Sequence, residues 1–160
     1  MITIENLKNR LQHNKLLVQR EDGYLEEELF TFHSPASAEE LKKLPDYIPE
    51  ELLSFFKKQN GAYLYESPHG GGGTQLFSIS ESLEYKDIWE CPNHFFPIGC
   101  GLDGLWIVCQ CIEGTKENVM WIGEFLNFED EEQFGKLNID YSTWLERFVI
   151  AQGSSFWEWS

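Results

Sequence analysis

The stretch FFPIGCGLDGLWIV, residues 95–108, decides between a nucleotide-binding loop that precedes a helix and a loop that joins two strands. Its glycines have the G-x-G-x-x-G spacing of a dinucleotide-binding loop. In such a loop a helix begins directly after the glycines, and its free N–H groups hold the pyrophosphate. Here the glycines lead into LWIVCQCI, residues 105–112, which is rich in β-branched and aromatic residues and has no helical period. The stretch therefore predicts two strands joined by a glycine-shaped loop, without a bound nucleotide.

The segments on either side of this stretch predict further strands. AYLYE (62–66), TQLFSI (74–79) and NVMWIGE (118–124) are strand-like, and their connections are mostly too short for parallel crossovers. KLLVQREDGYLEEELFTFH (15–33) resembles two strands turned at Gly23, although LEEEL (25–29) suits a helix equally well. We therefore expect a largely antiparallel sheet.

The clearest helix is IPEELLSFFKKQNG, residues 48–61, which joins acidic residues at its start to lysines at its end. Ile48, Leu52, Phe55 and Phe56 form an apolar stripe, so this helix is expected to lie across the sheet. The dipeptide at positions 60–61 predicts a left-handed cap at its end.

Four other segments predict shorter helices. One begins after Thr3 with an apolar stripe at Ile4, Leu7 and Leu11; one begins at a capping box, Ser37-x-x-Glu40; one is a turn at 80–85; the last lies in DYSTWLERFVIAQG (140–153). No internal repeat or linker divides the chain. The sequence predicts a single α+β domain over residues 1–160, with a largely antiparallel sheet flanked by helices.

Composition limits the partners. The 160 residues hold 12 Lys and Arg against 27 Asp and Glu, a net charge of −15, which disfavours nucleic acid and favours a basic protein partner. The alternative is that acidic clusters such as EDGYLEEE (21–28) and EDEE (129–132) only keep the protein soluble. With no long apolar run and no signal-like N-terminus, no membrane is expected and the cytoplasm is the predicted location.

Signals for catalysis and metal binding are weak. The loop HGGGG (69–73) resembles an esterase oxyanion motif, but no G-x-S-x-G elbow accompanies it, which favours a mobile loop. A hydrolase using His69 or His94 with Glu124 has no spacing to support it. We expect no enzyme and no cofactor.

The four cysteines suggest a zinc site, because Cys91-x-x-His94 and Cys109-x-Cys111 offer four ligands. Cys109 and Cys111 are two apart in a predicted strand, so they share one face with Leu105. This arrangement favours core packing, and no metal is expected.

Five segments in fixed order resemble the SUKH superfamily, founded on yeast cell-wall-synthesis regulators of the Smi/Knr type. They are LPDYIPEELLSFFKKQNGAYL, LFSISES, FFPIGCGLDGLWIV, ENVMWIGE and YSTWLERFV. The resemblance is strongest over residues 36–150 and leaves residues 1–35 as an N-terminal extension packed on the domain. It implies an α+β fold with no cofactor and no catalytic residues. Asp103 fits the family's Gly-Asp loop, whereas Cys109 and Gln110 stand near its second aspartate.

Many bacterial members of this superfamily resemble immunity proteins that neutralise a nuclease- or deaminase-type toxin, so the resemblance implies a non-catalytic protein-binding domain of this kind. Asp103, Trp106, Glu129, Asp130, Glu131 and Glu132 are the predicted partner-binding residues. Tyr85, Trp89, Trp106 and Trp121 are candidate aromatic anchors, with core packing as the alternative for each. The second hypothesis is a scaffold or regulatory module of the cell-wall-regulator type without a toxin partner.

Overall fold

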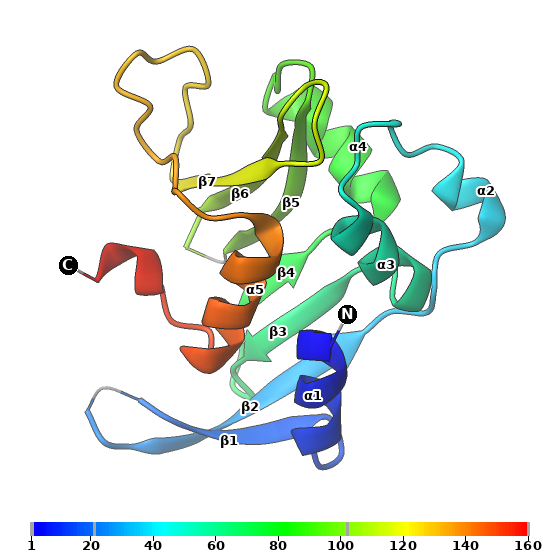
Figure 1. Cartoon of the computed structure of the whole chain (residues 1–160). Helices are drawn as coiled ribbons and strands as arrows, with labels where there is room; N and C mark the ends of the chain where they lie inside the picture. Colours follow the sequence, from blue (N-terminus) through cyan, green and yellow to red (C-terminus); the bar gives the residue numbers. More distant parts are fainter. Residues whose placement is uncertain (1, 21, 102, 160) are drawn as a thin grey trace.

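The computed structural model describes residues 2–20, 22–101 and 103–159, so Glu21 and Leu102 of the sequence motifs lie outside the described residues. Its centre is a seven-stranded sheet in which each strand pairs antiparallel with the next one along the chain (Figure 1). The strands are β1 (Lys15–Gln19), β2 (Leu25–Phe32), β3 (Ala62–Glu66), β4 (Thr74–Leu76), β5 (Phe95–Gly101), β6 (Trp106–Cys111) and β7 (Asn118–Gly123). The α+β class and the antiparallel sheet are confirmed.

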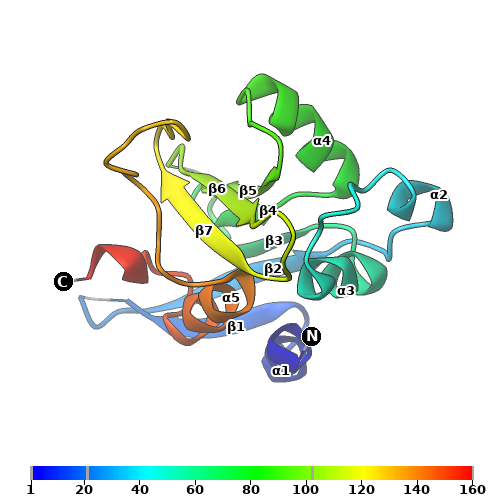
Figure 2. The same ribbon diagram turned by 45° about the horizontal axis from the view of Figure 1, so that its top comes forward.

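Helices cover both faces of this sheet, but unequally. They are α1 (Ile2–Arg10), α2 (Ala38–Leu41), α3 (Glu50–Lys58), α4 (Ile79–Ile88) and α5 (Tyr141–Ile150), and a short 3-10 turn, η1 (Phe156–Glu158), follows. α1, α3 and α5 lie on one face, whereas α4 lies on the other (Figures 1 and 2). The first face is called the α5 face below, and the second the α4 face. In the described residues, no helix combines the length and apolarity needed to cross a membrane.

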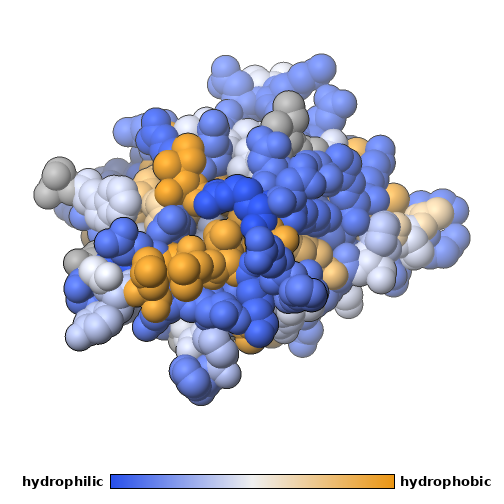
Figure 3. Space-filling model, turned by 90° about the horizontal axis from the view of Figure 1, so that it is seen from below, coloured by the Kyte–Doolittle hydropathy of each residue, from blue (hydrophilic) through white to orange (hydrophobic). Residues whose placement is uncertain are grey.

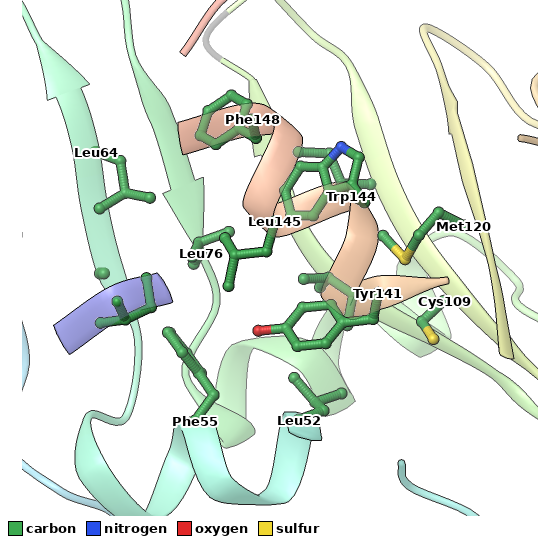
Figure 4. Packing of buried hydrophobic residues seen from close by; sticks show 14 of the residues in the cluster. Leu52, Phe55, Leu64, Leu76, Cys109, Met120, Tyr141, Trp144, Leu145 and Phe148 are labelled. Atoms are coloured by element: carbon green, nitrogen blue, oxygen red, sulfur yellow. The ribbon is translucent and has the colours of Figure 1, made fainter. Parts of the chain in front are cut away.

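The main core fills the α5 face. Trp144, Leu145 and Phe148 of α5 are almost completely buried and point toward the strands, while Leu52 and Phe55 close the core from α3 (Figure 4). The apolar stripes predicted for the helix after Thr3 and for the helix within residues 48–61 are confirmed by the burial of Ile4, Leu7, Leu52, Phe55 and Phe56. Cys109 and Cys111 are also buried in this core, as their spacing predicted.

The glycine fingerprint forms a β-hairpin, as predicted. Gly99 and Gly101 belong to β5, and Gly104 (φ +90°) makes the turn into β6. The Gly104 N–H donates to the Gly101 carbonyl at 3.0 Å. At Gly99, a Cβ would lie 2.1 Å from the Gln75 carbonyl oxygen, so glycine is needed where β4 and β5 approach most closely.

The helix predictions differ from the structure at three points, and at the first two a distant residue takes the bonding group. α3 ends at Lys58, and Gln59 is extended (φ −148°), so the Asn60-Gly61 cap does not form. The Ser37 side chain caps α2, but the Glu40 carboxylate accepts from Asn60 Nδ2 instead of completing the box. The predicted turn at 80–85 is a full helix, α4, which begins at a capping box of Ser78 and Glu81.

Candidate protein-binding surface

The α4 face carries an open, aromatic-lined hollow, called the aromatic groove below. It has a volume of about 730 Å³. Its walls come from the end of α4, from β6 and from the loop after β7. The lining residues are Ile88, Trp89, Glu90, Pro92, Trp106, Phe125, Leu126, Asn127, Phe128 and Glu129.

The inner wall of the groove is formed by two stacked indole rings. Trp89 and Trp106 lie with ring centroids 4.6 Å apart and planes 6° from parallel. Strand alternation places Trp106 on the α4 face, because its neighbours Leu105 and Ile107 are buried in the core of the α5 face. Both indoles are half-buried, so each retains an accessible part.

A lysine ties the end of α4 to the strand below it. Lys86 Nζ donates to the Phe95 carbonyl at 2.7 Å and to the Pro92 carbonyl at 3.0 Å. Burial lowers the pKa of Lys86 and raises the pKa of the nearby Cys91 thiol to about 12. These contacts hold the segment that carries Trp89, so the indole pair has a fixed support.

The outer wall of the groove comes from residues 124–134, called the acidic loop below. Leu126 is buried, and the Phe128 ring lies 4.7 Å from the Phe95 ring, so these two side chains anchor the loop. Phe125 remains 72% exposed, with its ring 5.3 Å from that of Trp106. An exposed aromatic ring beside a stacked indole pair is a suitable anchor for a partner.

Carboxylates border these rings. Glu90 and Glu129 line the aromatic groove directly. Asp130, Glu131 and Glu132 follow in the acidic loop, where the Asp130 carboxylate accepts from the Glu132 N–H at 3.0 Å. The structure therefore brings predicted residues Trp106 and Glu129 together, with the other three acidic residues on the same loop.

Asp103, the remaining predicted residue, belongs to another part of the surface. It lines a separate cleft of about 230 Å³ together with Arg20, Gly72, Gly73 and Ser155. Leu105 and Ile107 of the α5 face also line that cleft, so Asp103 and Trp106 do not share a surface.

The candidate anchors differ in accessibility. Trp121 is buried, and its Nε1–H donates to Gln110 Oε1 at 2.9 Å, which confirms core packing for this residue. Tyr85 is half-buried and stacks on Phe77 at 4.5 Å. Phe125 and Phe128 were missed from the sequence; the only available signal was the presence of aromatic residues within the acidic segment FLNFEDEEQF.

One pair of groups proposed for hydrolysis, His94 and Glu124, lies apart. β5 and β7 run in the same direction because each pairs antiparallel with β6. His94, which precedes β5, and Glu124, which follows β7, therefore lie at opposite ends of the sheet. Within the described ranges, no three His, Cys, Asp or Glu side chains are grouped so that they could hold a metal ion.

No family model matches this sequence. The protein is similar to two proteins of Bacillus subtilis (strain 168), named uncharacterized protein YobM and uncharacterized protein YnaB. It is 32% identical to YobM over 121 residues, which are 70% of this chain and 62% of YobM, so it spans less than two thirds of that relative. It is 23% identical to YnaB over 141 residues, covering 84% of this chain and 90% of YnaB.

Proposed function

We propose that this protein is a non-catalytic protein-binding domain of the immunity-protein kind, which binds and neutralises a basic cognate toxin in the cytoplasm. The toxin is of the nuclease or deaminase type. The observation that carries the proposal is the aromatic groove, where accessible rings are bordered by Glu90, Glu129 and the acidic loop. The resemblance to the SUKH superfamily supports the same class.

The chemistry of the groove suits a cationic partner segment. An arginine guanidinium can stack on the face of Trp89 or Trp106 and form an ion pair with a bordering carboxylate at the same time. Enzymes that act on nucleic acids carry such basic residues where phosphates bind. A protein that presents carboxylates there blocks the substrate, and its net charge of −15 speeds the encounter.

Co-expression with a toxin domain tests this function. A candidate nuclease- or deaminase-type toxin domain, taken from a neighbouring gene if one is found there, is induced together with the wild-type protein, Trp106→Ala or Trp159→Ala. Trp159 is the matched control, because it is an exposed tryptophan outside the groove. We expect the wild type and Trp159→Ala to restore growth, and Trp106→Ala to raise the dissociation constant for the toxin at least about tenfold.

The same experiment can reject the proposal. Equal protection by the folded wild type and Trp106→Ala, with binding that does not change with salt, would contradict it. That result would favour the alternative of a scaffold or regulatory module without a toxin partner.

A further inference from the structure

The two edge strands of the sheet, β7 and β1, differ in the hydrogen bonding of their outer backbone groups. The outer edge of β7 is closed by the segment that leads to α5: the Ile122 N–H donates to the Gly135 carbonyl at 2.8 Å, and the Leu137 N–H donates to the Met120 carbonyl at 2.8 Å. Among the described residues, none forms backbone hydrogen bonds along the outer edge of the second half of β1. Open edges of this kind accept another strand unless something blocks them.

The pairing of β1 with β2 identifies the free groups. The Phe30 N–H donates to the Asn14 carbonyl, and the Arg20 N–H donates to the Tyr24 carbonyl. The backbone N–H and C=O groups of the even-numbered residues in this strand therefore point toward β2. Alternation directs the N–H and C=O groups of Leu17 and Gln19 outward. Among the described residues, none bonds to these four backbone groups. The backbone groups of Lys15 are already occupied, because its N–H and C=O both bond to Gln12.

Two exposed leucines lie at this edge, among polar and charged side chains such as Arg10 and Asp22. Leu17 is 58% exposed and Leu25, which pairs with Gln19, is 61% exposed. Open hollows of about 600 and 760 Å³ lie along the edge, the second lined by Gln19, Ile150 and Trp159. Figure 3 views the molecule from the side of β1 and shows hydrophobic residues gathered there.

The charge at this edge is partly offset. Lys15 pairs with Glu27 at 2.9 Å, and Arg20 pairs with both Glu26 and Glu28, so two cations face three carboxylates. A lysine on an edge strand normally discourages pairing, but here its charge is neutralised by Glu27. These ion pairs reduce, without removing, the repulsion at this edge between two copies of a protein with net charge −15.

We propose that β1 pairs antiparallel with β1 of a second copy, about a two-fold axis at Val18, which makes one continuous sheet. In this register Leu17 lies opposite Gln19 of the second copy, and the reverse, so every free backbone group finds a partner. An axis at Leu17 would instead place Gln19 opposite Lys15, whose groups are occupied by Gln12. The Val18 axis also brings Lys15 of each copy toward the turn that carries Asp22 of the other.

Analytical ultracentrifugation of the full chain tests this dimer. The wild type should sediment with twice the 18.7 kDa of one chain. Leu17→Pro removes an outward N–H but no bond to β2, and it should raise the dimer dissociation constant at least about tenfold. Leu17→Val keeps the N–H and should leave the dimer intact.

A second variant keeps the test decisive if proline disturbs the strand. Leu17→Lys replaces an exposed apolar side chain of the interface by a long charged one and should also give monomers, which circular dichroism should show to be folded. A wild type that stays monomeric at about 0.5 mM, or folded Leu17→Pro and Leu17→Lys variants that dimerise like the wild type, would overturn the proposal. Trp106→Ala should leave the dimer unchanged, so failure here is distinct from failure of toxin binding.

Discussion

The two faces of the sheet use tryptophan in different ways. On the α5 face, Trp144 is 0% exposed and is enclosed by helices and strands. On the α4 face, Trp89 and Trp106 stack on each other and stay half-buried, because α4 leaves part of that side uncovered (Figure 2). The same residue type therefore maintains the fold on one face and lines an accessible groove on the other.

The largest expected effect is on the α5 face. Trp144→Ala should lower the free energy of unfolding by about 3–5 kcal/mol, because it empties a large, closed site. Trp144 Nε1 is buried without a hydrogen-bond partner among the described residues, so Trp144→Phe should cost clearly less. Urea denaturation measures the free energy of unfolding of both variants. Equal losses would contradict the prediction, because the phenylalanine ring would then not replace the volume that the indole fills.

The next largest loss of stability is expected where β4 and β5 approach most closely. Gly99→Ala should cost about 3 kcal/mol, since its Cβ would meet the Gln75 carbonyl oxygen and force β4 away from β5. Gly104→Ala is the control: its Cβ meets no atom within 4 Å, and only its positive φ is strained, so about 1 kcal/mol is expected. Thermal unfolding that ranks the two in the opposite order would contradict the close approach.

On the α4 face the expected loss of stability is smaller. Trp106→Ala should lower the free energy of unfolding by about 1–2 kcal/mol, because part of its ring is already in water. Urea denaturation beside Trp144→Ala gives the direct comparison of the faces. If the two alanine variants lose equal stability, Trp106 is a core residue and the contrast between the faces fails.

The smallest effect on stability is expected in the acidic loop. Glu129→Lys combined with Glu131→Lys should change the free energy of unfolding by less than about 0.5 kcal/mol, because both side chains are exposed. Association with a basic toxin domain should become slower and less sensitive to salt. Glu146→Lys, an exposed acidic residue of α5, is the control in stopped-flow measurements. Because it changes the net charge by half as much as the double variant, an effect half as large there would mean that only net charge matters.

The sequence predicted the elements well where the pattern was local. Alternation and the turn at Gly23 located β1 and β2, and the apolar stripe located α3. Helix ends were missed where side chains bond across the fold: Gln59 accepts from Lys8 Nζ at 2.7 Å, and Asn60 Oδ1 accepts from the Ile79 N–H at 2.9 Å. Such long-range bonds leave no local signal, so the cap at Asn60-Gly61 was a reasonable but wrong prediction.

The candidate surface was predicted in part. Trp106 and the acidic segment were selected from the sequence, but strand order was required to bring Glu129 beside Trp89 and to place Asp103 elsewhere. Phe125 could not be recognised, because whether a ring in a loop faces solvent depends on which neighbours are anchored. Here Leu126 and Phe128 are anchored, and Phe125 is left exposed.

The two walls of the aromatic groove differ in how well they tolerate substitution. Trp89 caps the end of α4, and Trp106 begins β6, a strand paired on both sides, where substitution disturbs the sheet. Phe125 and Glu129 stand on a loop held by a few buried contacts. Mutations in that loop can alter the chemistry of the groove while the scaffold persists. On the proposed function, the recognition surface at residues 124–134 diverges faster between lineages than the architecture that carries it.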